Sequence, residues 1–256
     1  MNPLEVRPGP VGADAGGVVG AAGLVDPAGL VDPAGVVAVA GVVGADRVGG
    51  IEAVVFDLGN VLVRWDPYRA FVGRMERIEV DRFFADIDFP AFNARQDAGR
   101  TWTQARADVA RRFPEHVRAV DLYLEHFAAA LPGPVAGSEQ VVRDLGAAGV
   151  RLLGLTNWSA ETYHHAVPAA PAIGLLEGVL VSGQVGLAKP DPRIFALLAE
   201  RFALDPGRTV FIDDSQVNVA AARHAGYRAV WFTQAEALRR DLAALGLPVG
   251  ASLPRP

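Results

Sequence analysis

The side chains in this sequence that could perform chemistry together are polar residues that follow short apolar runs. Four of them come directly after a predicted buried strand, and one lies in a loop before a predicted helix. They are Asp57, Thr156, Lys189, Asp213 and Asp214. Because parallel strands end at one edge of a sheet, we expect these groups to converge there. The sequence therefore predicts a site of three carboxylates, one hydroxyl and one amine.

Carboxylates that gather at one place predict a bound cation, because burying them unpaired is costly. Mg²⁺ suits such a site, since it takes one or two carboxylates, keeps several waters and works with phosphates. Asp57 could then attack phosphorus as a carboxylate nucleophile. Lys189 and Thr156 could hold the phosphoryl oxygens, whose negative charge grows in the transition state. These residue types favour Mg²⁺-dependent hydrolysis of a phosphate ester.

Each residue also has a simpler explanation when it is considered alone. Asp57 could only cap the turn at Gly59 and Asn60, since both residues tolerate tight turns. One of the acids at 213–214 could cap the following helix, and a single Lys189 could be a solvated lysine. The ordered set, and not any one member, is what favours a catalytic site.

The apolar pattern predicts an α/β fold with a doubly wound parallel sheet. The predicted strands cover residues 53–56, 150–155, 179–181, 209–212 and 229–232. The predicted helices cover residues 138–148, 193–202 and 215–225, with a short helix capped by Ser159 and a last helix in a capping box of Thr233 and Glu236. Strands that alternate with helices favour a parallel sheet covered on both faces.

The segment 67–131 contains no convincing buried strand. Thr101, with Gln104 at the capping-box position, predicts a helix that runs to Phe113. Pro114 can open the next helix, whose apolar face extends to Leu131. About 65 helical residues exceed an ordinary crossover between parallel strands, which needs about a dozen. We therefore expect an inserted all-helical cap at 67–131, on an α/β core formed by 50–66 and 132–248.

Residues 1–49 are predicted to be a disordered, low-complexity tail. They are built mainly from Gly, Ala, Val, Pro and Asp, and the six residues at 24–29 recur directly at 30–35. A short repeat with Pro and Gly in each copy cannot hold a helix or a long strand. A start codon assigned upstream of the true domain would explain the segment equally well.

Composition excludes several classes of protein. The net charge of −5 and the lack of a Lys/Arg run argue against a nucleic-acid partner. The absence of cysteine excludes disulfides, thiolate nucleophiles and cysteine metal sites. No apolar run approaches the roughly 20 residues of a membrane span, and the first residues lack the order of a signal peptide. We expect a cytoplasmic protein with a small-molecule partner, whose oligomeric state the sequence does not indicate.

The motifs resemble those of the haloacid dehalogenase superfamily, in the subfamily with a helical cap after the first strand. The matching stretches are 56–61, 155–157, 189–190 and 211–214 with Asn218. The resemblance covers roughly residues 51–245. It implies that Asp57 is the nucleophile, that Thr156, Asn157 and Lys189 bind phosphate, and that Lys189 also neutralises the nucleophile. It further implies Mg²⁺ on Asp57, the Gly59 carbonyl and Asp214, with Asp213 and Asn218 in support.

One departure from the family pattern concerns proton transfer. Phosphatases of this family usually carry a second aspartate, a general acid and base, at the position of Gly59. True haloacid dehalogenases usually have Tyr-Gly-Thr here, whereas this chain has Gly-Asn-Val and resembles a branch that includes sugar-phosphate phosphatases. Without the acid, we expect a preference for good leaving groups, muted if water or a cap side chain supplies the proton.

Two other functions stay open at this point. In a 2-haloacid dehalogenase, Asp57 would attack carbon without a metal, and the paired acids at 213–214 argue against that chemistry. A catalytically weak binding or regulatory protein could have kept the fold and lost the acid at Gly59. The substrate is not disclosed, and the cap-side candidates for contacting it are Arg64, Trp65, Asn93 and Arg95.

Overall fold

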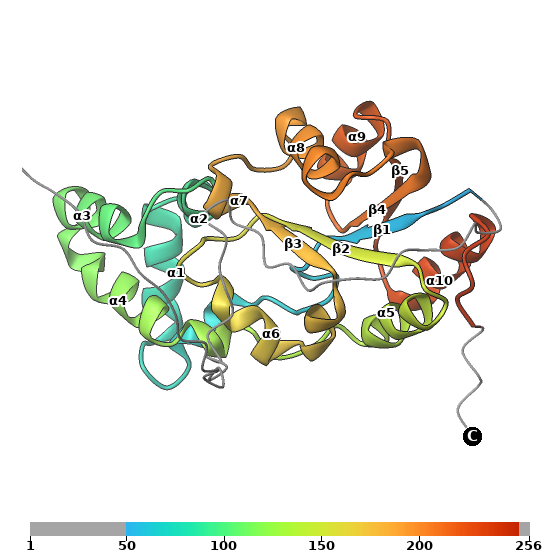
Figure 1. Ribbon diagram of the computed structural model, residues 1–256. Helices are drawn as coiled ribbons and strands as arrows, with labels where there is room; N and C mark the ends of the chain where they lie inside the picture. Colours follow the sequence, from blue (N-terminus) through green and yellow to red (C-terminus); the bar gives the residue numbers. More distant parts are fainter. Residues whose placement is uncertain (1–49, 251–256) are drawn as a thin grey trace, which may run out of the picture. The chain divides into compact units, whose positions relative to one another are not determined.

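The computed structural model describes residues 50–250, and the predicted tail at 1–49 lies outside them (Figure 1). Its centre is a five-stranded sheet in the order β3-β2-β1-β4-β5, in which all neighbouring strands are parallel. The strands are β1 Ala53–Phe56, β2 Arg151–Thr156, β3 Gly178–Val181, β4 Thr209–Asp213 and β5 Arg228–Trp231. The α/β fold with a parallel sheet is thus confirmed.

Helices cover both faces of the sheet, because successive strand residues point to opposite faces. Val54 and Phe56 of β1 pack in one hydrophobic cluster with α5 and α10, whereas Ala53 and Val55 pack in a second cluster with α8 and α9. Figure 1 shows the two helix pairs on opposite sides of the strands. The helices are α5 Ser138–Ala147, α8 Pro192–Phe202, α9 Gln216–His224 and α10 Ala235–Ala244.

The register of the central strands brings the carboxyl ends of β1, β2 and β4 together. Phe56, the last residue of β1, pairs with Gly154 on one side and Ile212 on the other. Asp57 follows Phe56 directly, and Thr156 and Asp213 are the last residues of β2 and β4. The expected convergence of these side chains at one edge therefore has a structural basis in the strand pairing.

The long insertion between β1 and β2 is helical, as the sequence predicted. Within 67–131 the structure has helices and 3₁₀ turns only. The helices are α1 Arg77–Asp86, α2 Phe89–Asp97, α3 Trp102–Arg112 and α4 Val117–Glu125. Thr101 and Gln104 form the predicted capping box at the start of α3. The separate cap domain stays a prediction, because the aromatic residues of the insertion belong to the same hydrophobic cluster as residues beneath the sheet.

Three local predictions are wrong. The helix expected from Pro114 to Leu131 is split into a 3₁₀ turn, α4 and a second 3₁₀ turn, because the backbone at His126 leaves the helical region. Ser159 starts a turn, and the short helix α6 begins only at Ala166. Thr233 does not cap α10, because the chain stays extended through Gln234, which takes the N-cap position without a side-chain bond.

No helix within residues 50–250 combines the length and the apolar character that crossing a membrane requires.

Candidate active site

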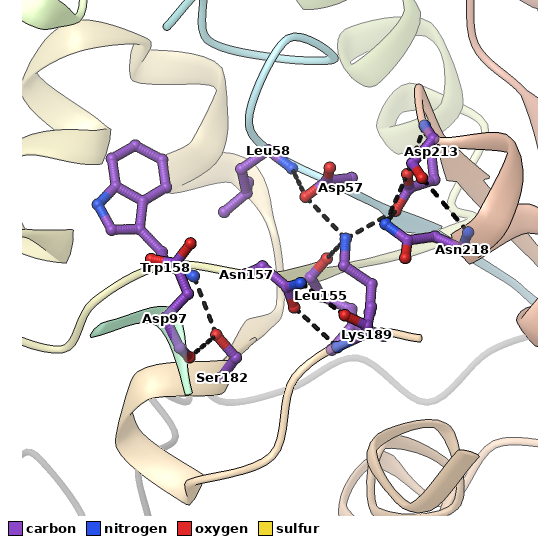
Figure 2. Close-up of polar contacts among 11 residues, drawn as sticks. Asp57, Leu58, Asp97, Leu155, Asn157, Trp158, Ser182, Lys189, Asp213 and Asn218 are labelled. Atoms are coloured by element: carbon purple, nitrogen blue, oxygen red, sulfur yellow. Dashed lines mark hydrogen bonds and ion pairs between the residues drawn. The ribbon is translucent and has the colours of Figure 1, made fainter. Parts of the chain in front are cut away.

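The side chain of Lys189 lies at the centre of the polar cluster at the carboxyl edge of the sheet (Figure 2). Its Nζ is 2.9 Å from Oδ1 of Asp57 and 2.7 Å from Oδ2 of Asp213. It also donates to the carbonyl of Leu155 at 2.9 Å, so that each of its three hydrogens has an acceptor. Burial alone lowers the pKa of Lys189, but the charges of Asp57 and Asp213 outweigh it and raise the pKa. The lysine is therefore a fixed positive charge.

Asn157 holds Lys189 in place through two bonds to its main chain. The Asn157 amide donates to the Lys189 carbonyl at 2.8 Å and accepts from the Lys189 amide at 2.8 Å. Asn157 follows β2 directly, whereas Lys189 comes from the loop before α8. The side chain that sequence reasoning assigned to phosphate is thus already engaged in fixing the lysine loop against the end of β2.

Asp57 is buried just beyond β1, and its contacts leave one oxygen free. Oδ1 accepts from the Leu58 amide at 2.7 Å and from Lys189, and within residues 50–250 no partner occupies Oδ2. Burial raises the pKa of Asp57 to about 7; Lys189 opposes that rise, and Asp213 and Asp214 add to it. A free carboxylate oxygen beside a buried cation is the arrangement a nucleophile needs.

Asp213 has the opposite character, because both of its oxygens are saturated. Oδ1 accepts from the Ser215 amide at 2.8 Å, and Asn218 donates to Oδ1 and Oδ2 at 3.1 Å each. Oδ2 also accepts a hydrogen bond from Nζ of Lys189. This fully buried carboxylate is suited to orienting Lys189 and Asn218, as sequence reasoning expected of a supporting residue.

The donor set fits a divalent cation. Oxygens of Asp57, Asp213 and Asp214 lie within 4.8 Å of one another, and Asp213, whose oxygens are already bonded, adds negative charge and not a direct ligand. Burial and the charge of Asp213 raise the pKa of Asp214, against the lowering effect of Lys189. One lysine for three carboxylates leaves excess negative charge, and oxygen ligands at this spacing suit Mg²⁺.

The remaining two predicted site residues also lie at this edge. Thr156 is buried at the end of β2, where it pairs with Val181 of β3. Gly59 lines a cavity of about 80 Å³, and its backbone is not in the left-handed region. A side chain placed there would meet no atom within 4 Å of its Cβ. Steric hindrance therefore does not explain why this position lacks an aspartate.

The inner cavity, as we call this space, adjoins a larger and more open hollow, which we call the aromatic groove. The groove has a volume of about 710 Å³, and its apolar lining comes from Trp65, Pro67, Tyr68, Phe84, Phe89 and Pro90. Trp65, Asn93 and Asp97 line both spaces. The two hollows therefore adjoin each other along these three residues.

Two of the four substrate-contact candidates line these hollows. Trp65 and Asn93 line both, whereas Arg64 is exposed and donates to the carbonyl of Pro132 at 2.9 Å. Arg95 is exposed and lies over the ring of Phe92. Neither arginine is among the residues that line the two hollows.

Sequence reasoning missed Asp97 and Ser182. Asp97 is the last residue of α2 and lines the inner cavity. Ser182 begins the short helix α7 Ser182–Val185 and bonds to the backbones of both Asp97 and Trp158. Neither residue stands in a motif, and nothing local in the sequence distinguishes Asp97 from an ordinary acid at a helix end.

A family model described as haloacid dehalogenase-like hydrolase matches residues 51–226. The chain belongs to this family of hydrolases, as the motifs suggested. The fold agrees: the HAD family enzyme bt-2542 from Bacteroides thetaiotaomicron superposes with a TM-score of 0.62 at 21% identity, over 75% of this chain and 98% of that one.

Two of the three relatives described here are named as phosphatases. Drimenol cyclase drtB of Aspergillus calidoustus is 26% identical over 75% of this chain and 36% of its own length. Phosphoserine phosphatase of Thermus thermophilus is 31% identical over 54% and 51%. Sesquiterpene phosphatase astK of Aspergillus oryzae is 27% identical over 76% and 96%. The chain thus spans about half or less of the first two relatives, but nearly all of the third.

Proposed function

We propose that this hydrolase is a Mg²⁺-dependent phosphatase that acts on a small phosphate monoester with an apolar body. The observation that carries the proposal is the position of Lys189 between Asp57 and Asp213, next to a third carboxylate. An anionic group at this place would meet a fixed positive charge and a free nucleophilic oxygen.

Asp57, the carbonyl of Gly59 and Asp214 would hold the Mg²⁺ ion, with Asp213 and Asn218 in support. When it is bound, the ion would neutralise phosphoryl charge that Lys189 alone cannot balance. In support, bt-2542 has been crystallised in complex with magnesium and inorganic phosphate. Its likeness to this chain concerns the fold, and the ligand assignment here rests on the three clustered carboxylates.

The chain's own residues would act in two steps. In the first, Oδ2 of Asp57 attacks phosphorus and the bond to the leaving oxygen breaks, which gives an aspartyl-phosphate. In the second, water attacks that phosphorus and releases inorganic phosphate and the Asp57 carboxylate. Lys189 and the Thr156 hydroxyl would stabilise the phosphoryl oxygens, and Asn157 would hold Lys189 at the required position.

The aromatic groove supports an apolar substrate body. Its volume lies in the about 300–1,000 Å³ range of pockets for drug-sized ligands. The aromatic rings that line it, among them Phe84 and Phe89 stacked at 4.1 Å between centroids, outnumber its polar side chains Asp81, Asn93 and Asp97. The name of the sesquiterpene phosphatase relative points the same way. We therefore favour a prenyl or similar apolar phosphate over a sugar phosphate.

The test is phosphate release from a matched panel with and without Mg²⁺. Farnesyl phosphate, a short alkyl phosphate and glucose 1-phosphate share the phosphate and differ in the body. We expect Mg²⁺-dependent release with the highest kcat/KM for farnesyl phosphate. Equal values for all three would refute the apolar body. Halide release from haloacids in EDTA, without any phosphate release, would replace the proposed function with a dehalogenase.

A further inference from the structure

We infer that Asp97, which helix α2 brings to the inner cavity that Gly59 also lines, is the general acid and base of the reaction. This inference rests on the proposed phosphatase function and names a catalytic residue for it. It would fill a chemical gap, because a phosphate ester with a poor leaving group needs a proton as its alkoxide departs. General acid–base catalysis of this kind contributes about 10²–10⁴-fold.

The first argument is the composition of the cavity wall. Among the described residues that line it, only Asp97 and Tyr123 carry a group that could exchange a proton of this kind. Burial raises the pKa of Tyr123 well above its usual range, so that this phenol stays protonated at neutral pH. Its oxygen also accepts from the indole of Trp65 at 3.3 Å. Asp97 is therefore the carboxyl group on the wall that can both give and take a proton.

The second argument is that Asp97 is held in place from two sides. Within α2, the Asn93 amide donates to Oδ2 of Asp97 at 2.9 Å. From the α/β core, the Ser182 hydroxyl donates to the Asp97 carbonyl at 2.5 Å and accepts from the Trp158 amide at 2.9 Å. Figure 2 shows Ser182 joined to both Asp97 and Trp158. A buried serine thus ties the end of α2 to the loop that follows β2.

The electrostatic environment agrees with the assigned role. Burial raises the pKa of Asp97 to about 7; a bond from the Ser159 backbone and the charge of Lys189 oppose the rise, and the charge of Asp57 adds to it. Asp57 and Lys189 are the charged groups whose fields reach Asp97 from the core. Near neutral pH both protonation states are populated, as a group that alternates between acid and base requires.

The proton balance closes over the two steps. In the first, Asp57 forms its bond to phosphorus, the electron pair of the broken bond goes to the leaving oxygen, and that oxygen takes the proton of Asp97. In the second, the Asp97 carboxylate takes a proton from the attacking water as the aspartyl-phosphate bond breaks. Asp97 ends protonated, and the products are the alcohol and inorganic phosphate.

The experiment compares Asp97→Asn with Asp88→Asn on a series of aryl phosphates whose leaving phenols differ in acidity. Asp88 is an exposed acid at the other end of α2, and asparagine tolerates its left-handed backbone. Rapid mixing with Mg²⁺-loaded enzyme separates phenol release, the first step, from the later hydrolysis. Circular dichroism and melting curves establish that both variants are folded.

For Asp97→Asn we expect phenol release to fall by about 10²–10⁴-fold with the least acidic phenol and much less with the most acidic. Because the second step also loses its base, the most acidic phenol should appear in a burst of about one equivalent per site. Asp88→Asn should behave like the wild type. Adding Gly59→Asp to Asp97→Asn should restore part of the lost rate, since the position has room for a side chain.

Two results would overturn the inference, and they are distinguishable. If the wild type releases phosphate but Asp97→Asn retains the wild-type dependence on phenol acidity and shows no burst, Asp97 is not the acid and the phosphatase assignment stands. If the wild type releases no phosphate from any ester, the proposed function fails and the role of Asp97 fails with it.

Discussion

Lys189 and Asp213 form an ion pair of 2.7 Å in which neither side chain is exposed to solvent. Removing one partner of such a pair leaves an uncompensated buried charge, which costs about 3–5 kcal/mol. Lys189→Met should therefore lower the free energy of unfolding by about that amount, as well as abolish turnover. Urea denaturation in EDTA measures the change. Adding Asp213→Asn should recover part of the lost stability, and a double variant no more stable than the single one would contradict this account.

Asp57→Asn should abolish turnover while the fold persists. Asparagine keeps the shape of the side chain and its bond from Leu58, but it lacks the negative charge that attacks phosphorus. Loss of a nucleophile should reduce kcat by more than about 10⁴-fold. The measurement is phosphate release from farnesyl phosphate, with mass spectrometry to exclude deamidation back to aspartate. Retained turnover in verified asparagine protein would rule out the covalent mechanism.

Removal of the metal should stop turnover reversibly, and Asp214 should set the metal affinity. We expect no phosphate release in EDTA and recovery on addition of Mg²⁺. Asp214→Asn should raise the Mg²⁺ concentration for half-maximal rate by at least about 10-fold, comparable to the losses seen around other metal sites. Asp241→Asn, an exposed acid on α10, is the matched control. An unchanged Mg²⁺ requirement in Asp214→Asn would remove this residue from the ligand set.

The aromatic groove should govern the affinity for the substrate body and not the chemistry. Phe84 is half-buried, stacks on Phe89 and lines the groove but not the inner cavity. Phe84→Ala should raise KM for farnesyl phosphate about tenfold, a loss of about 1.4 kcal/mol, and leave a short aryl phosphate unaffected. Ile78→Ala, at an exposed position on α1, should change neither value. Equal effects of Phe84→Ala on both substrates would show that the groove does not hold the body.

The stability of the protein should depend on pH through Asp97. Its pKa is about 7 in the folded state and near 3.8 when unfolded, so the folded state binds the proton more tightly. The stabilisation that this group contributes is fully present below about pH 4 and is lost as the pH rises through about 7. Asp97→Asn does not titrate. The free energy of unfolding of Asp97→Asn minus that of the wild type, both measured in EDTA, should therefore increase between pH 5 and pH 8. A difference that stays constant over this range would contradict the raised pKa of Asp97.

Local sequence pattern determined the sheet and the location of most of the site. A buried strand needs a run of apolar residues, and the chain must turn where the run stops. Asp57, Thr156 and Asp213 follow or end such runs, and the strand pairing brings them to one edge. The same reasoning failed at Thr233, because a capping pattern does not determine how far the chain stays extended after a strand.

Only the tertiary structure decided the surroundings of these residues. Asp97 stands in an ordinary helical stretch, and its role follows from the bonds of Ser182 to both Asp97 and Trp158, which are far apart in the sequence. The two hydrogen bonds between the Asn157 side chain and the main chain of Lys189 could not be predicted from the sequence either. Burial and the fields of distant charges are properties of packing between segments. The sequence by itself therefore placed the candidate nucleophile, while the fold alone brought a candidate proton donor to the cavity that Gly59 lines.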